Sequence, residues 1–175
     1  MSITSPEAGL RVGAFADVVD VAYLGNAAYR YAVAAVGIRG EVFLCRDLVS
    51  QEPPITLHYQ NLAGRVYRVV SGHGHLLILT SKAIYILANL AKRLVQPIFD
   101  KSKSLFMTIP MMAVDATVVG DKWLFTVMSD SVHRYDLDVI DQKIAEFARN
   151  GIIQEPMLSS PTPPAWTARE LSLVG

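Results

Sequence analysis

Three segments of this 175-residue chain share one order of apolar, glycine and polar residues, and this repetition most constrains the fold. In each segment an alternating apolar run is followed by a glycine-bearing turn, a denser apolar run, a short polar break and a further run. The segments are Val18–Leu48, Arg65–Leu90 and Ala113–Leu137. Their turn glycines, Gly25, Gly74 and Gly120, are separated by 49 and 46 residues. Such a period indicates a repeated supersecondary unit rather than unrelated elements.

The patterns within each unit predict antiparallel strands. Runs such as "VYRVV" and "EVFLCRDL" alternate with a period of two, which gives a strand one buried and one exposed face. The denser runs "LLIL" and "WLFTV" are typical of strands covered on both faces. The segments "SGHGH", "VGDK" and "TSKA" supply the glycine and small polar residues of tight hairpins. Each unit is therefore expected to be a meander of roughly four strands.

A meander that recurs at this spacing resembles a blade of the β-propeller superfamily. The third unit, "VVGDKWLFTVMSDSVHRYDLDVIDQKIAEF", resembles a WD-repeat, kelch or quinoprotein-type blade most clearly, and the second, "VVSGHGHLLILTSKAIYILANL", is next. The resemblance covers Val18 to Phe147. It implies an all-β fold, a partial β-propeller of about three four-stranded antiparallel blades. We expect a blade-like domain over residues 1–155, with units near 12–60, 65–100 and 113–155, and a proline-rich connector and strand-like tail over 156–175.

Two segments are also compatible with helices. "SKAIYILANLAKRLVQPI" could begin at a capping Ser81 and end at Pro97. "DVIDQKIAEFARNG" has an amphipathic pattern that Gly151 would stop. If both form helices, the fold is α+β with antiparallel hairpins.

The amino-acid composition limits the kinds of partner that we expect this chain to bind. The 16 basic and 16 acidic residues balance, so nothing favours nucleic acid or an anionic membrane. The single cysteine, Cys45, cannot form an internal disulfide, and the N-terminal stretch has no basic start followed by an apolar run. We therefore expect a cytoplasmic protein without membrane segments. The 51% hydrophobic content suggests surface reserved for a protein partner.

The "GHGH" segment is the most conspicuous candidate site. His73 and His75 alternate, so on a strand they would point to one side, as two metal ligands would. Both fall at the hairpin turn of the repeat, however, and we interpret them as turn residues, with metal binding the weaker alternative. Cys45 and the histidines His58 and His133 occupy strand-like runs and are expected to be structural. No catalytic residue and no cofactor is predicted.

Three units are fewer than the four to eight blades of closed propellers, so apolar blade faces would be left open. We expect a non-catalytic interaction or scaffold module that joins a second copy or another chain to complete a ring. The tail, with four prolines before "ARELSLVG", could reach a neighbour by strand addition, and its expected interface residues are Trp166, Leu171, Leu173 and Val174. The alternative is a ligand-binding or enzymatic propeller whose central site uses His73, His75 and Asp121.

Overall fold

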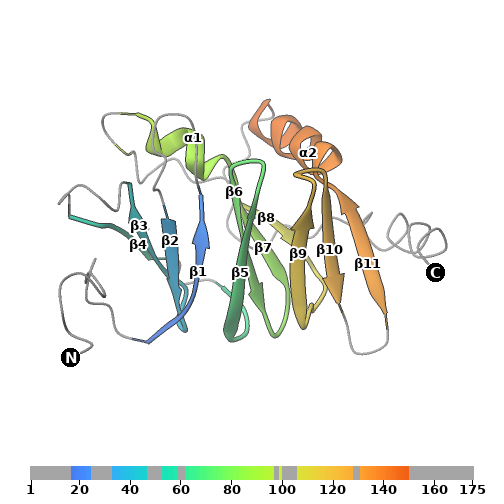
Figure 1. The fold of residues 1–175 in the computed structure, drawn as a ribbon, viewed down its shortest axis with the longest axis horizontal. Coiled ribbons are helices and arrows are strands. Elements are labelled where there is room, and N and C mark those ends of the chain that lie inside the picture. The colour runs from blue at the N-terminus through green and yellow to red at the C-terminus, as the bar shows by residue number, and fades with distance from the viewer. Residues whose placement is uncertain are drawn as a thin grey trace, which may run out of the picture.

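The structure is a computed structural model that describes residues 17–24, 33–46, 53–58, 62–96, 99, 106–127 and 131–149. The tail predicted to bind a partner, with Trp166, Leu171, Leu173 and Val174, lies outside the described residues. Within the described ranges the chain forms three antiparallel sheets and two short helices (Figure 1). The predicted predominance of antiparallel strands is confirmed.

Each sheet is a meander whose strands pair in chain order. The first contains β1 (Val18–Tyr23), β2 (Val33–Gly37), β3 (Glu41–Cys45) and β4 (Ile55–His58). The second contains β5 (Val66–Gly72), β6 (His75–Thr80), β7 (Ile84–Leu87) and β8 (Phe106–Ile109). The third contains β9 (Asp115–Val119), β10 (Trp123–Val127) and β11 (Val132–Asp136). The second sheet thus continues past residue 100, where the sequence suggested that its unit ends.

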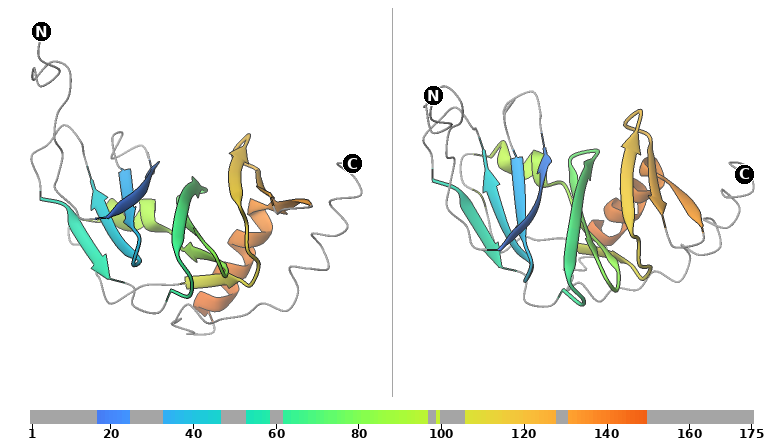
Figure 2. Two further views of the ribbon diagram at one scale, coloured as in Figure 1. Left: turned by 90° about the horizontal axis from the view of Figure 1, so that it is seen from below. Right: turned by 60° about the horizontal axis from the view of Figure 1, so that its bottom comes forward.

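The sheets stand side by side, and their first strands β1, β5 and β9 are neighbours along one side (Figure 2). Two side-chain interactions link the first two of these strands. Asp20 Oδ2 accepts the Val69 N–H at 3.0 Å, and the Ser71 hydroxyl donates to the Tyr23 carbonyl at 2.6 Å. Between β5 and β9, Arg68 and Asp115 form an ion pair at 2.8 Å. The edges of the first strands are therefore joined by side chains rather than by strand pairing.

Two apolar cores separate the sheets. The middle sheet contributes to both because every residue of β6 is buried: Leu76 and Ile78 face the first sheet, and Leu77 and Leu79 face the third. This confirms the interpretation of "LLIL" as a strand covered on both faces. The dense run "WLFTV" behaves differently in the described part of the chain. Only alternate residues of β10 are buried, because one face of the third sheet lacks a neighbouring sheet there.

The two helices close the cores at the end of the sheets where β5 turns into β6 (Figure 1). Helix α1 (Leu90–Leu94) packs Leu90 and Leu94 into the core between the first and second sheets. It is much shorter than the helix considered for Ser81–Ile98, since Ile84–Leu87 form β7. Neither helix in the described part of the chain is long and apolar enough to cross a membrane.

Helix α2 (Leu137–Arg149) confirms the helical alternative for the second amphipathic segment. It occupies the place where the propeller resemblance implied a fourth strand in the third unit. Its buried residues Leu137, Ile140 and Ile144 are spaced three and four apart, which makes a stripe on a helix. As a strand, the same residues would be divided between two faces.

Candidate functional site

The "GHGH" segment, residues 72–75, contains the hairpin turn between β5 and β6, and the two central residues of this turn are His73 and Gly74. Gly72 pairs with His75, and the turn residues His73 and Gly74 have φ values of 50° and 78°. Positive φ at both central positions is the geometry of a type I′ hairpin, in which glycine is favoured and other residues are uncommon. The predicted turn is confirmed for His73, whereas His75 is the first residue of β6 and not a turn residue. A non-glycine residue in this conformation needs support from its surroundings.

His75 is buried, and its hydrogen bonds determine its tautomer. The backbone N–H of Asn89 donates to Nδ1 at 2.8 Å, so Nδ1 is an acceptor without a proton. Nε2 lies 2.6 Å from Oδ1 of Asp141 and must carry the hydrogen that it donates. His75 is therefore neutral. Burial lowers its pKa, and the Asp141 hydrogen bond and charge only partly offset this effect, while the nearby charge of His73 lowers the pKa further.

The hydrogen bonds of His73, in contrast, require a proton on both ring nitrogens. Its Nδ1 is 2.8 Å from Oδ2 of Asp141, and its Nε2 hydrogen-bonds to the backbone carbonyl of Asp121. Carbonyl and carboxylate oxygens accept hydrogen bonds, so both ring nitrogens carry protons and the ring is an imidazolium. Burial by itself would lower the pKa of His73. The hydrogen bonds to Asp141 and Asp121 and the negative charges of both residues outweigh it, and the net pKa is raised.

We call this group, His73, His75, Asp121 and Asp141, the His–Asp clasp. Asp141 lies on α2 and accepts one hydrogen bond from each histidine, through different carboxylate oxygens. The clasp therefore ties the hairpin of the second sheet both to α2 and to the β9–β10 turn. Asp141 was not predicted as a site residue, because it is 66 residues from His75 in the sequence. The sequence does contain one indication of its role. Asp141 is a charged residue within the apolar stripe of α2, next to Ile140 and between Leu137 and Ile144.

A second polar group adjoins the clasp. Lys122 Nζ is 3.0 Å from Asp136 Oδ1 and 2.5 Å from Asp138 Oδ2. The hydrogen bond to Asp138, followed by that to Asp136, raises the pKa of Lys122. Together these side chains attach the β9–β10 turn to the end of β11 and the start of α2.

The described residues include one group with spacing compatible with a metal ion: His73, Asp138 and Asp141 place potential ligand atoms within 4.8 Å of one another. These atoms already have partners, because His73 and Asp141 bond to each other and Asp138 binds Lys122. His75 is poorly suited as a ligand, since the Asn89 N–H uses the lone pair of Nδ1 and Nε2 must keep its proton. The structure therefore assigns these side chains as a hydrogen-bonded network.

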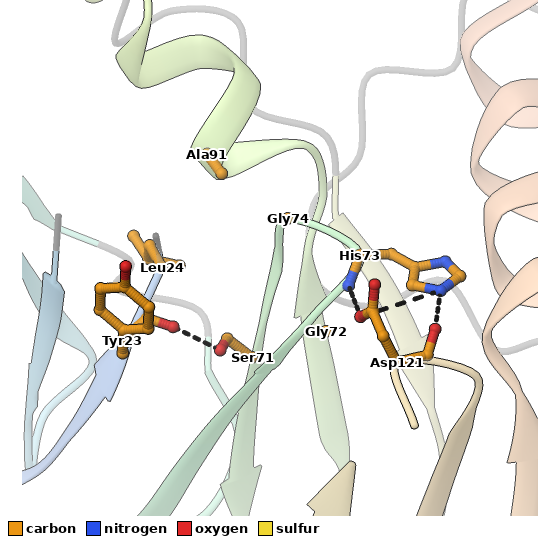
Figure 3. A pocket seen from close by; sticks show the side chains of 8 residues that line it. All are labelled: Tyr23, Leu24, Ser71, Gly72, His73, Gly74, Ala91 and Asp121. Carbon is orange, nitrogen blue, oxygen red and sulfur yellow. Dashed lines mark hydrogen bonds and ion pairs between the residues drawn. The ribbon is translucent and has the colours of Figure 1, made fainter. Parts of the chain in front are cut away.

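A cavity of about 360 Å³ adjoins the clasp where β1, the β5–β6 hairpin, α1 and the β9–β10 turn meet. His73 and Asp121 lie on one side of it, and Tyr23 and Ser71 on the other (Figure 3). The Asp121 side chain is 78% exposed, so its carboxylate is open to solvent. His73 and Asp121, two of the three residues predicted for a central site, thus line this cavity.

The remaining candidates from the sequence lie on strands. His58 ends β4, and His133 is buried on β11 with the Ser131 hydroxyl 3.2 Å from its Nε2. Cys45 ends β3 and is half-buried, and burial raises the pKa of its thiol. A raised thiol pKa disfavours the reactive thiolate, in agreement with a structural role.

The large hydrophobic side chains that the described residues expose are concentrated at the two ends of the row of sheets. None lies on a strand of the second sheet. Three are on β1, namely Val18, Val21 and Tyr23, and three are on the third sheet, namely Val119, Val127 and Val132. On the third sheet these valines share a face with Trp123, Phe125 and Arg134, as the strand register shows, and Arg134 stacks 4.1 Å from the Trp123 ring.

No protein-family model matches the chain, and comparison with curated proteins and with solved structures likewise gives no match.

Proposed function

We propose that this chain is a non-catalytic interaction module, a partial β-propeller that a second copy or another chain completes. The observation that carries the proposal is the placement of the exposed hydrophobic residues. Six of the nine that the described residues expose lie on strands of the first and third sheets, whose outer faces have no neighbouring sheet within the described part of the chain, and none lies on a strand of the second. Apolar patches of this kind mark interaction surfaces.

The propeller geometry is supported by three features. Each sheet is a meander, the sheets pack face to face, and their first strands are adjacent. In addition, β1 and β5 shift register at corresponding places, between Val18 and Asp20 and between Val66 and Arg68. A bulge recurring at one position in two units is a feature of related units. The third unit departs from the pattern, because α2 follows β11.

The proposal includes the tail. Trp166, Leu171, Leu173 and Val174 would add to the interface with the partner, as a strand that follows a proline-rich connector can. It also includes a cytoplasmic location, which the single half-buried Cys45 supports.

The test is the solution mass, measured by light scattering across a dilution series. We expect the 19.2 kDa chain to form a dimer or a larger closed assembly. Replacing Val119 and Val127 with lysine should dissociate it, because both residues lie on the outer face of the third sheet. Val95→Lys is the matched control, since Val95 is 44% exposed but follows α1 rather than lying on an end sheet.

Polar replacement of Trp166, Leu171, Leu173 and Val174 tests the tail separately. Circular dichroism of each variant establishes that the strands are retained. A wild-type chain that stays monomeric at every concentration and captures no partner chain would overturn the proposal. Assembly that survives the tail substitutions would remove only the tail from it.

A second candidate function is ligand binding in the cavity between β1, the β5–β6 hairpin, α1 and the β9–β10 turn. The observation that favours it is the cavity of about 360 Å³ beside His73 and Asp121. Native mass spectrometry of the purified protein, with and without Asp121→Asn, would detect a retained small molecule. A retained mass that the substitution abolishes would favour this function, and a bare polypeptide mass would count against it.

A further inference from the structure

The contact between α2 and the second sheet combines apolar packing with a polar attachment, the clasp. Leu137, Ile140 and Ile144 of α2 are buried in the core shared with the second sheet. At the edge of that core, Asp141 reaches the β5–β6 hairpin and accepts hydrogen bonds from His73 and His75. Apolar packing does not depend on protonation, whereas these hydrogen bonds do.

The geometry points to a pH-sensitive latch: the clasp holds α2 and the β9–β10 turn against the second sheet only while His73 is charged and His75 is neutral. The two requirements follow from the partners of the four ring nitrogens. Chemistry fixes the role of all four partners, because the Asp121 carbonyl and both oxygens of the ionised Asp141 carboxylate can only accept a hydrogen bond, and the Asn89 backbone N–H can only donate one.

Loss of a proton from His73 opens the latch on the alkaline side. The neutral ring keeps one N–H, so it can bond to Asp141 or to the Asp121 carbonyl but not to both. The nitrogen without a proton then turns a lone pair toward an oxygen. Either the link to α2 or the link to the β9–β10 turn is lost.

Gain of a proton by His75 opens the latch on the acidic side. The added hydrogen would sit on Nδ1, directly against the Asn89 N–H that now donates to it. Two donors would then face each other at 2.8 Å in a buried place. His75 would have to turn away and release Asp141.

The charges around the clasp favour the same two protonation states, a charged His73 and a neutral His75. Asp141 from α2 and Asp121 from the β9–β10 turn face His73 and favour its charge. Lys122, from the same turn, is neutralised by Asp136 of β11 and Asp138 of α2. On the side of α1, the partner of His75 is the uncharged backbone N–H of Asn89. The charge of His73 opposes a second charge on His75.

The raised pKa of His73 and the lowered pKa of His75 give the pH window. His73 contributes stability that is fully present below the unfolded imidazole pKa of about 6.5 and is lost as pH rises through its folded pKa. Neutral His75 contributes stability that is present above about 6.5 and is lost as pH falls through its folded pKa. The latch is therefore strongest near pH 6.5 and weakens on both sides.

The first experiment uses the unmodified full-length protein: an NMR titration of the four histidine ring signals between pH 5 and 9. We expect the His73 inflection above that of a free imidazole and the His75 inflection below it. Signals are assigned with His73→Gln and His75→Gln. Inflections of both residues on the same side of the free imidazole value would overturn the proposal, whatever the variants do.

The second experiment follows urea unfolding of the same proteins across this pH range. The wild-type midpoint should peak near pH 6.5. His73→Gln should lose the decline on the alkaline side, His75→Gln should lose the decline on the acidic side, and Asp141→Asn should flatten both. Lys143→Gln, on the same helix and paired with Glu146, is the matched control and should keep the wild-type curve. A merely structural clasp would lower every midpoint equally and leave the shape of the curve unchanged, which would contradict the latch.

Discussion

Asp20 accepts the backbone N–H of Val69 through Oδ2 at 3.0 Å, across the boundary between the first and second sheets. Val69 lies on β5, the first strand of its sheet, and has strand pairing on one side only. The carboxylate thus satisfies a backbone donor that no strand reaches. The register shift of β1 between Val18 and Asp20 accompanies this contact.

Removing this carboxylate should destabilise the contact between the two sheets. Asp20→Ala leaves the N–H of the buried Val69 without an acceptor, which costs about 1–3 kcal/mol in free energy of unfolding. Asp20→Asn keeps an acceptor oxygen and should cost clearly less. Urea denaturation followed by circular dichroism measures both, and an alanine variant as stable as the wild type would show that the bond contributes nothing.

The turn glycines offer a matched pair of substitutions. Gly74 and Gly120 both have positive φ, 78° and 59°, so alanine at either position should cost about 1–2 kcal/mol of backbone strain. A Cβ at Gly74 would also lie 3.3 Å from the Cβ of Ala91 in α1, whereas a Cβ at Gly120 meets nothing within 4 Å. Gly74→Ala should therefore lower the melting temperature more than Gly120→Ala does. The reverse order would show that α1 yields to the added methyl group without cost.

Removing the buried hydroxyl should have different effects on the free energy of unfolding at two tyrosines, Tyr85 and Tyr67. The Tyr85 hydroxyl accepts the Ala63 N–H at 2.8 Å, and Tyr85→Phe should lower the free energy of unfolding by about 1 kcal/mol. The Tyr67 hydroxyl is buried without a hydrogen-bond partner among the described residues, and burial raises its pKa. Tyr67→Phe should be neutral or stabilising, because an unsatisfied polar atom is removed. Equal losses in chemical denaturation would contradict this contrast.

The Lys122 ion pairs should contribute little to stability in spite of their short distances. Lys122 is 41% exposed, so solvent screens its interactions with Asp136 and Asp138. We expect Lys122→Gln to lower the free energy of unfolding only slightly at low salt, because solvent screens both ion pairs. The loss should shrink further at high ionic strength. A large loss that salt does not reduce would mean that Lys122 acts through packing against Trp123, whose ring lies 5.2 Å away.

Much of the strand arrangement is predictable because it is local. The alternating and dense runs correspond to β1, β5 and β6, and the "GHGH" turn follows from the conformational freedom of Gly74. The helix α2 could also be recognised, from the spacing of Leu137, Ile140 and Ile144. The lengths of the units were harder to predict. The strand β8 joins the second sheet only because Phe106–Ile109 pairs with Ile84–Leu87, and pairing across an intervening helix has no local signature.

The sequence by itself determined that the chain forms hairpins in three successive units, because period-two patterns and turn residues act within a few positions. It also placed His73 and His75 at one turn. Only the tertiary structure decided what these histidines do. Asp141 reaches them from a helix 66 and 68 residues away, and Asn89 and Asp121 approach from two other elements. The protonation state of each ring depends on which atoms face its nitrogens, and those atoms are brought there by packing between the sheets.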